Sequence, residues 1–381
     1  MLARNTAGLF GLQLSGRARI LVTLDSQAAD DPEFAVQLGR HGADAVRINC
    51  AHDNPDAWAR MIVNIRKAEM MTGRPIRILM DIAGPKVRLA AVTTPRESNR
   101  LNVGDEIVLC RGLGACSEAA RFKASCTPAT VFDDLKIGDP VSIDDGKLRG
   151  HLVRQTANGF VAHLEEGRLK GLKLKPQRGI NFPGAALTLD PITEEDRHAL
   201  DFIAENADLV GYSFVETAEH VAQLQDELAS RRAGKPLLPL VAKIETPRAV
   251  KNLPEIIVQA AGRQPLAIMI ARGDLAVELG FTRLAEMQEE ILWLCEAAHI
   301  PAIWATQVLE SLVTKGMPSR GEMTDAAMAS RAECVMLNKG PNVLRAIDTL
   351  DRLLPRMSEH QVKKTPTLRA LHSWSEDHPR H

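Results

Sequence analysis

Short apolar runs alternate with amphipathic segments over most of the chain. The runs are rich in Ile, Leu and Val and short enough to be buried strands, and the segments between them have helical periodicity. One such segment places Trp58, Met61, Ile62 and Ile65 on a single helix face. The predicted strands are 18–25, 43–50, 76–82, 207–215, 238–245, 266–274, 300–307 and 333–340. From 89 to about 182 the runs are instead divided by Gly-Asp turns, which is typical of an all-β unit.

Eight strand–helix units interrupted after the third strand predict an α/β fold, a (β/α)8 TIM barrel with an inserted all-β barrel. We expect the barrel to occupy 17–88 and 183–355, the inserted lid 89–182, and a polar C-terminal tail 356–381. A short amphipathic helix is the alternative for that tail. The rival architecture is a doubly wound open sheet, but no G-x-G-x-x-G opens its first helix.

Polar residues gather where the predicted strands end. In a barrel of this kind, functional side chains lie at the C-terminal ends of the strands, so these residues are expected to meet at one mouth. They are Arg47 and Asn49, Asp81, Ser213, Lys243 and Glu245, Asp274, Thr306 and Gln307, and Asn338 and Lys339.

Composition narrows the classes of partner. The net charge is -1 and only 4% of residues are aromatic, which argues against nucleic acid as the main partner. The six cysteines form no C-x-x-C pair, as expected for reduced thiols in a cytosolic protein. No apolar run is long enough to cross a membrane and no signal-peptide core is present, so a cytoplasmic location without a membrane partner is expected.

Lys243 and Glu245 lie two positions apart in one strand and therefore point to the same side. A structural ion pair is one interpretation, and an active site is the other. Glu245 and Asp274 could together hold Mg²⁺, although Asp274 could instead be a helix N-cap. Lys243 beside a metal suits a transferring phosphoryl group or an enolate. Arg47 and Arg88 would add phosphate donors, or form surface ion pairs, and no P-loop is present.

A set of motifs in fixed order resembles the pyruvate kinase family. They run from about 18 to 340 and include AVRINCAHD, LMDIAGPKVR, IDDG, GINFPG, SFVETAEHV, VAKIETPRAVKNL, IMIARGDLAVELG and ATQVLESLVTKGMPSRGEMTDAA. The resemblance implies a (β/α)8 barrel with a β-barrel lid after strand 3. It also implies phosphate transfer from phosphoenolpyruvate to ADP, giving pyruvate and ATP, with Mg²⁺ or Mn²⁺ as cofactor.

The resemblance assigns roles to residues of this chain. Glu245 and Asp274 match the metal ligands, Lys243 the group that stabilises the transferring phosphoryl, and Thr306 the residue near the protonated enolate carbon. Arg47 is counted with these catalytic residues. The substrate-binding positions are Ala271, Arg272, Gly273, Asp274, Thr306 and Ser213. The nucleotide- or phosphate-binding positions are Arg47, Asn49, His52, Arg88 and Arg178, where Arg178 replaces the usual Lys.

One departure concerns the monovalent cation. Many family members bind K⁺ with an Asn, a Ser, an Asp and a carbonyl; here Asn49 and Asp81 are kept, but the Ser position is Ala51. The family's D-T-K-G-P-E is D-I-A-G-P-K at 81–86, so Lys86 stands where Glu is usual. Because a tethered ammonium can replace K⁺, we expect Lys86 to act as its surrogate and activity to be independent of K⁺.

Two further departures leave alternatives open. The family's MLSGETAKG after strand 8 is here MLNKGPNVL, which puts that edge of the nucleotide site in doubt. The family's C-terminal α/β domain has no counterpart in this sequence, so control by a sugar phosphate is not expected and the oligomeric state stays open. A metal-dependent lyase or aldolase acting on pyruvate or oxaloacetate enolates, and a non-catalytic regulatory relative, are the alternative functions.

Overall fold

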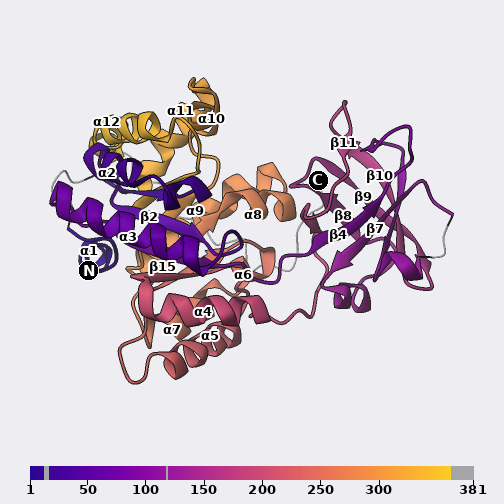
Figure 1. The fold of residues 1–381 in the computed structure, drawn as a ribbon, viewed down its shortest axis with the longest axis horizontal. Helices are drawn as coiled ribbons and strands as arrows, with labels where there is room; N and C mark the ends of the chain where they lie inside the picture. Colours follow the sequence, from indigo (N-terminus) through magenta and orange to yellow (C-terminus); the bar gives the residue numbers. More distant parts are fainter. Residues whose placement is uncertain (13–16, 117–118, 362–381) are drawn as a thin grey trace. The chain divides into compact units, whose positions relative to one another are not determined.

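The computed structural model describes residues 1–12, 17–116 and 119–361, and its chain divides into two compact units. The first is formed by Met1–Gly84, Ile192–Arg272 and Ala285–His381. The second is formed by Pro85–Pro191 and Gly273–Leu284. In Figure 1 the first unit carries helices around a sheet, and the second consists mainly of strands.

The first unit is a closed parallel barrel, which confirms the predicted fold class. Its strands pair in the order β1-β17-β16-β15-β14-β13-β3-β2, and every pairing is parallel. The strands are β1 (Arg19–Thr23), β2 (Ala45–Asn49), β3 (Arg77–Ile82), β13 (Leu209–Tyr212), β14 (Leu240–Ile244), β15 (Leu266–Ala271), β16 (Ala302–Ala305) and β17 (Cys334–Leu337). Their parallel order brings all C-terminal ends to one mouth.

Helices follow the barrel strands, and most begin at a side chain that caps the first turn. Thr193 and Ser319 form capping boxes, and Asp31, Asn54 and Thr246 accept from first-turn N–H groups. The helices are α2 (Pro32–His41), α3 (Pro55–Thr72), α4 (Glu194–Asn206), α5 (Ala218–Arg231), α6 (Pro247–Lys251), α7 (Leu253–Ala261), α9 (Phe281–Ala297), α10 (Glu310–Lys315), α11 (Arg320–Met328) and α12 (Val343–Gln361), with short 3₁₀ turns η1 (Ser26–Ala29) and η4 (Ala329–Arg331).

An N-terminal helix, α1 (Leu2–Phe10), packs into the interior of the barrel unit. Leu9 and Phe10 are buried in one apolar cluster with side chains of the barrel strands, among them Leu21, Val241 and Met336. Asn5 on the same helix donates to the carbonyl of His299, 2.8 Å away. The helix therefore adds apolar side chains to a core that the strands do not fill alone.

The second unit is built on a seven-stranded sheet in the order β12-β8-β9-β10-β6-β7-β4, with a small β11-β5 pair. Its strands are β4 (Arg88–Thr93), β5 (Arg100–Leu101), β6 (Glu106–Cys110), β7 (Phe122–Thr127), β8 (Pro140–Ile143), β9 (Leu148–Thr156), β10 (Gly159–Gly167), β11 (Leu172–Lys173) and β12 (Ile180–Asn181), with 3₁₀ turns η2 (Leu113–Ala115) and η3 (Ala129–Asp133). A bridge between Arg88 and Gly179 joins the two ends of the sheet. The predicted insertion after the third barrel strand is therefore a barrel-like all-β unit with its own apolar core.

The barrel strands are shorter than predicted, and two of the differences concern the site residues and the end of the chain. The strand predicted over 266–274 ends at Ala271, because helix α8 (Arg272–Leu279) starts immediately afterwards and takes Gly273 and Asp274 into its first turn. Residues 356–361 belong to α12 rather than to a tail, and the rest of the predicted tail, 362–381, lies outside the described residues. Within the described ranges, no helix combines the length and apolarity that a membrane span requires.

Candidate active site at the barrel mouth

Lys243 is a buried cation at the end of β14, and it has three polar neighbours from three strands. Its ammonium lies 2.7 Å from the Ser213 hydroxyl, 3.2 Å from a Glu245 oxygen and 3.4 Å from Asp81 Oδ2. Lys243 is only 7% exposed, and Glu245 and Asp81 are buried more deeply. The two charges that the sequence places on one side of a strand are therefore in direct contact.

Arg47 on β2 supplies the second cation of the cluster. Its Nε donates to Asp81 Oδ2 over 2.6 Å, and its Nη1 donates to the Thr23 hydroxyl over 3.4 Å. Two cations, Arg47 and Lys243, thus face two carboxylates, Asp81 and Glu245. The buried charge is balanced, as desolvated ions require.

Asp81 is fully buried, and its position depends on a glycine in the neighbouring strand. A Cβ atom at Gly211 would lie 1.9 Å from Asp81 Oδ1, so no larger residue fits there. Burial alone would raise the pKa of Asp81, but the Arg47 guanidinium and the Lys243 ammonium hold that pKa below its ordinary value. Asp81 is therefore a permanent anion that orients the two cations.

Ser213 and Glu245 are fixed by the backbone of adjacent strand ends. The Ser213 hydroxyl donates to the carbonyl of Ile82 over 2.7 Å, and Glu245 accepts from the N–H of Phe214 over 2.5 Å. The turn that carries Ile82 continues through Gly84, whose φ of +70° and close approach to the Ser213 carbonyl require a residue without a side chain. The cluster is consequently held from four strands before any ligand binds.

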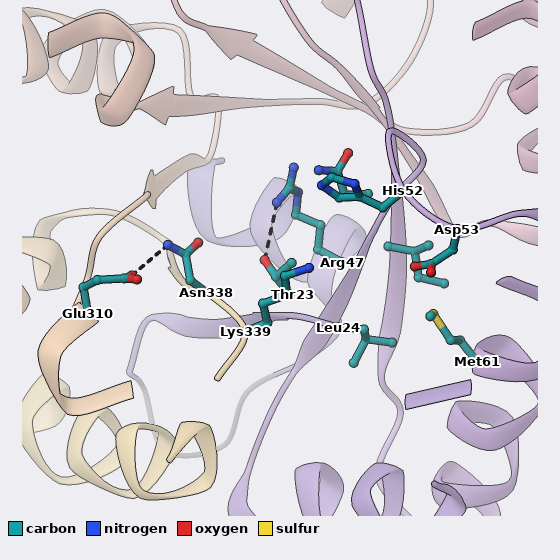
Figure 2. A pocket seen from close by; sticks show the side chains of 11 residues that line it. Thr23, Leu24, Arg47, His52, Asp53, Met61, Glu310, Asn338 and Lys339 are labelled. Carbon is teal, nitrogen blue, oxygen red and sulfur yellow. Dashed lines mark hydrogen bonds between the residues drawn. The ribbon is translucent and has the colours of Figure 1, made fainter. Parts of the chain in front are cut away.

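A pocket of about 350 Å³ opens beside this cluster. Figure 2 shows its side chains, with Arg47 hydrogen-bonded to Thr23 on one side and Asn338 to Glu310 on the other. Its lining residues are Thr23, Leu24, Arg47, Ile48, Asn49, His52, Asp53, Met61, Glu310, Asn338 and Lys339. The lining combines apolar side chains with three basic side chains and two acidic ones, so it suits a ligand that has both an apolar part and charged groups.

The predicted nucleotide-side residues of the barrel unit all line this pocket. Arg47, Asn49 and His52 belong to it, and Asn49 also accepts from the N–H of Ala51 over 3.2 Å, which closes the turn after β2. Lys339 lines the pocket from the end of β17 and is exposed. The departure after strand 8 thus places an amide and an ammonium in the wall of this pocket.

Five predicted site residues belong to the second unit: Lys86, Arg88, Arg178, Gly273 and Asp274. The Lys86 ammonium lies 2.5 Å from Asp274 Oδ1 and 3.8 Å from Asp145 Oδ1. Arg178 pairs with both oxygens of Asp144 at 2.8 Å, and Arg88 donates to the carbonyl of Gln177 over 3.3 Å. Lys86 therefore neutralises the carboxylate of Asp274 directly.

Thr306, directly after β16, has an unusual backbone. Its φ is +64° and that of Gln307 is +58°, a region that β-branched residues rarely adopt. Arg272 donates to the carbonyls of Ala305 and Thr306, so its guanidinium is committed to the chain itself. Ala271, another predicted substrate-binding residue, is the buried last residue of β15.

Three side chains that contact residues at the strand ends were not singled out from the sequence. Thr23 ends β1 and contacts Arg47, and its polar side chain after an apolar run was a usable signal. Glu310 and Asp325 lie on helices after β16 and reach Asn338 and Arg272 across the mouth. Nothing in their local sequence marks them, because their partners are 28 and 53 residues away in the chain.

Carboxylate oxygens suit a hard divalent cation such as Mg²⁺ or Mn²⁺ better than Zn²⁺ or Cu²⁺. Within the described ranges, no three His, Cys, Asp or Glu residues gather as a complete metal site. Mg²⁺ commonly takes only one or two protein carboxylates and fills its other positions with substrate oxygens and water. Carboxylates such as Glu245 and Asp274 therefore fit Mg²⁺ better than Zn²⁺.

Comparison with known proteins agrees with these features. A family model described as "Pyruvate kinase, barrel domain" matches residues 15–341. The chain is 30% identical over 361 residues to a pyruvate kinase of Agrobacterium vitis, covering 93% of this chain and 72% of the relative. It is 32% identical to a pyruvate kinase of Methylorubrum extorquens, with 90% and 69% covered. It is 31% identical to a pyruvate kinase of Aeropyrum pernix, with 85% and 66% covered.

Proposed function

The chain belongs to the pyruvate kinase family, and from this premise we propose that it transfers the phosphoryl group of phosphoenolpyruvate to ADP. Family membership makes it a pyruvate kinase-type phosphotransferase. In the proposed reaction the bond between phosphorus and the enol oxygen breaks, and a β-phosphate oxygen of ADP forms the new bond. The enolate that remains takes a proton at its terminal carbon and becomes pyruvate.

The observation that carries the proposal is the buried Lys243 at the centre of the mouth. An ammonium in contact with Ser213, Asp81 and Glu245 is already desolvated and oriented. Its reorganisation energy is therefore small when negative charge develops beside it. Such charge appears on the equatorial oxygens of a transferring phosphoryl group. Arg47, held by Asp81, would bind the same group from the second strand.

Glu245 and Asp274 are the proposed holders of Mg²⁺ or Mn²⁺. The metal would neutralise phosphate charge when it is bound. Glu245 contacts Lys243 and accepts from the N–H of Phe214, and Asp274 pairs with Lys86, so neighbouring groups hold both carboxylates in place. This assignment rests on the chemistry of the two carboxylates and on their matching positions in the family motifs.

Lys86 is the proposed substitute for K⁺. Its ammonium pairs with Asp274. We propose that it supplies the positive charge that a bound monovalent cation would supply beside an anionic substrate. Pocket residues Asn49, His52 and Lys339 are the proposed nucleotide contacts of the barrel unit, with Arg88 and Arg178 from the second unit. Thr306 is proposed to act near the carbon that is protonated.

The test is pyruvate release from phosphoenolpyruvate, ADP and Mg²⁺, followed in parallel by ³¹P NMR of the nucleotide. We expect Lys243→Met to lower kcat by about 10³-fold, because its preorganised charge is lost, as for other groups that stabilise transition-state charge. Lys67→Met, on the exposed face of α3, is the matched control and should leave kcat unchanged.

Two results would contradict the proposal. A Lys243→Met variant with near wild-type turnover would remove Lys243 from the reaction. Wild-type protein that releases pyruvate from oxaloacetate without ADP, and forms no ATP, would instead favour the lyase alternative.

A further inference from the structure

The guanidinium of Arg272 donates hydrogen bonds to two successive carbonyls of the segment that carries Thr306. Its Nε donates to the carbonyl of Ala305 over 2.9 Å, and its Nη2 donates to the carbonyl of Thr306 over 2.7 Å. These carbonyls flank the Thr306 backbone N–H and Cα on both sides. The guanidinium is therefore hydrogen-bonded to the peptide groups on both sides of Thr306.

The same guanidinium is also held by a carboxylate and an aromatic ring. It forms a two-point pair with Asp325 on α11, in which Nη2 lies 2.9 Å from Oδ2 and Nη1 donates to Oδ1. It also lies 4.6 Å from the ring centroid of Trp304, which is fully buried. The side chain of Arg272 is only 11% exposed. A planar fork held by a carboxylate and an aromatic ring is rigid, and a lysine could not reproduce its geometry.

The backbone at Thr306 and Gln307 has an unfavourable conformation that neighbouring groups must stabilise. Thr306 and Gln307 both have positive φ, +64° and +58°. This region is unfavourable for residues other than glycine, and least favourable for a β-branched residue such as Thr. A backbone of this kind persists only where its surroundings hold it.

We propose that Arg272 is a positioning residue, which holds the Thr306 hydroxyl in place through the carbonyls of Ala305 and Thr306. The inference rests on the proposed function, because it assumes that Thr306 acts near the carbon that is protonated. Arg272 itself touches no reacting atom in this account. Asp325 extends the chain of contacts to α11 and keeps the guanidinium plane aligned.

A double-mutant cycle tests whether Arg272 acts through Thr306. We expect Arg272→Lys to lower kcat by about 10²-fold and to leave the KM for ADP unchanged. A loss of this size is typical when a group that takes part in the reaction is displaced by roughly 1 Å. In a Thr306→Ala background the same change should cost less than about threefold, because the residue that it positions is already gone. Arg331→Lys is the matched control, since Arg331 also pairs with one carboxylate, Glu289, on the barrel unit.

Backbone amide exchange of residues 305–309 in the same variants gives a readout that needs no turnover. We expect faster exchange in Arg272→Lys and in Asp325→Asn, and no change in Arg331→Lys. Unchanged exchange in both of the first two variants would overturn the inference, and so would equal losses of kcat with and without the Thr306 side chain. Wild-type kcat in Thr306→Ala would contradict the role proposed for Thr306, whereas the exchange data would still report on Arg272. If Arg272→Lys does not fold, Asp325→Asn carries both measurements.

Discussion

A lysine and a glutamate two positions apart on a barrel strand raise the question of why a buried strand should carry both. Lys243 and Glu245 contact each other at 3.2 Å, and Asp81 and Arg47 complete a cluster with no net charge. A structural ion pair would satisfy the same contacts. The position of the cluster favours a site, because it lies at strand ends beside a pocket lined by charged and apolar side chains.

At the residue scale, Lys339 offers a test of the pocket. It is exposed in the pocket wall, and replacing it with Ala would remove one cation near the proposed nucleotide phosphates. We expect the KM for ADP to rise about fivefold, which corresponds to about 1 kcal/mol for an exposed charge. Steady-state kinetics with ADP varied and phosphoenolpyruvate saturating would measure it. Lys67→Ala is the control, and an unchanged KM for ADP in Lys339→Ala would remove Lys339 from the nucleotide site.

At the element scale, the strands and helices followed from the hydrophobic pattern, whereas several contacts of the site did not. All eight barrel strands were predicted, because a short apolar run with polar residues at its ends is typical of a buried strand. The strand predicted to reach Asp274 was too long, since periodicity does not show where a helix follows without a loop. The left-handed backbone of Thr306 could not be predicted either, because nothing in a Thr-Gln sequence favours positive φ.

Another contact that joins elements is the buried Arg17. It pairs with Asp44 at 2.7 Å and with Asp351 of α12 at 2.7 Å, and it donates to the carbonyl of Gly42. Arg17→Met would leave Asp44 buried with fewer partners, so we expect the free energy of unfolding to fall by about 3–5 kcal/mol. Urea denaturation followed by circular dichroism would measure this loss.

The matched control for Arg17 is Arg40, whose pair with Glu33 lies on the surface. Both side chains of that pair are more than half exposed, at 59% and 65%. Arg40→Met should change the free energy of unfolding by less than about 0.5 kcal/mol. Equal losses in the two variants would show that the Arg17 network adds no special stability.

At the scale of the whole molecule, the chain combines a closed parallel barrel with an all-β unit inserted after the third strand. Lys243, Arg47 and Glu245 lie in the first unit, and Lys86, Asp274 and Arg178 lie in the second. Lys86, which pairs with Asp274 in the second unit, is the residue that we propose to replace K⁺.

Exchanging the charge of Lys86 should change the cation requirement of the whole enzyme. Lys86→Glu would place a carboxylate beside Asp274, and like charges in contact cost several kcal/mol. We expect turnover without K⁺ to fall roughly 10²-fold and to recover when K⁺ is added, because the new carboxylate would bind K⁺ in place of the ammonium. Lys86→Met is the control: it has neither the ammonium nor a carboxylate, so K⁺ should rescue it little. Equal rescue of both variants would contradict this role for Lys86.

The most direct test of the account is a coupled pyruvate-release assay on the wild-type protein. Phosphoenolpyruvate, ADP and Mg²⁺ would be supplied in K⁺ and, separately, in tetramethylammonium at equal ionic strength. The account predicts ATP-forming turnover in both, with rates that agree within about twofold, because Lys86 supplies the charge that K⁺ would otherwise bring. Activation by K⁺ of several-fold or more would contradict the role of Lys86, and the absence of pyruvate and ATP in both salts would contradict the proposed reaction itself.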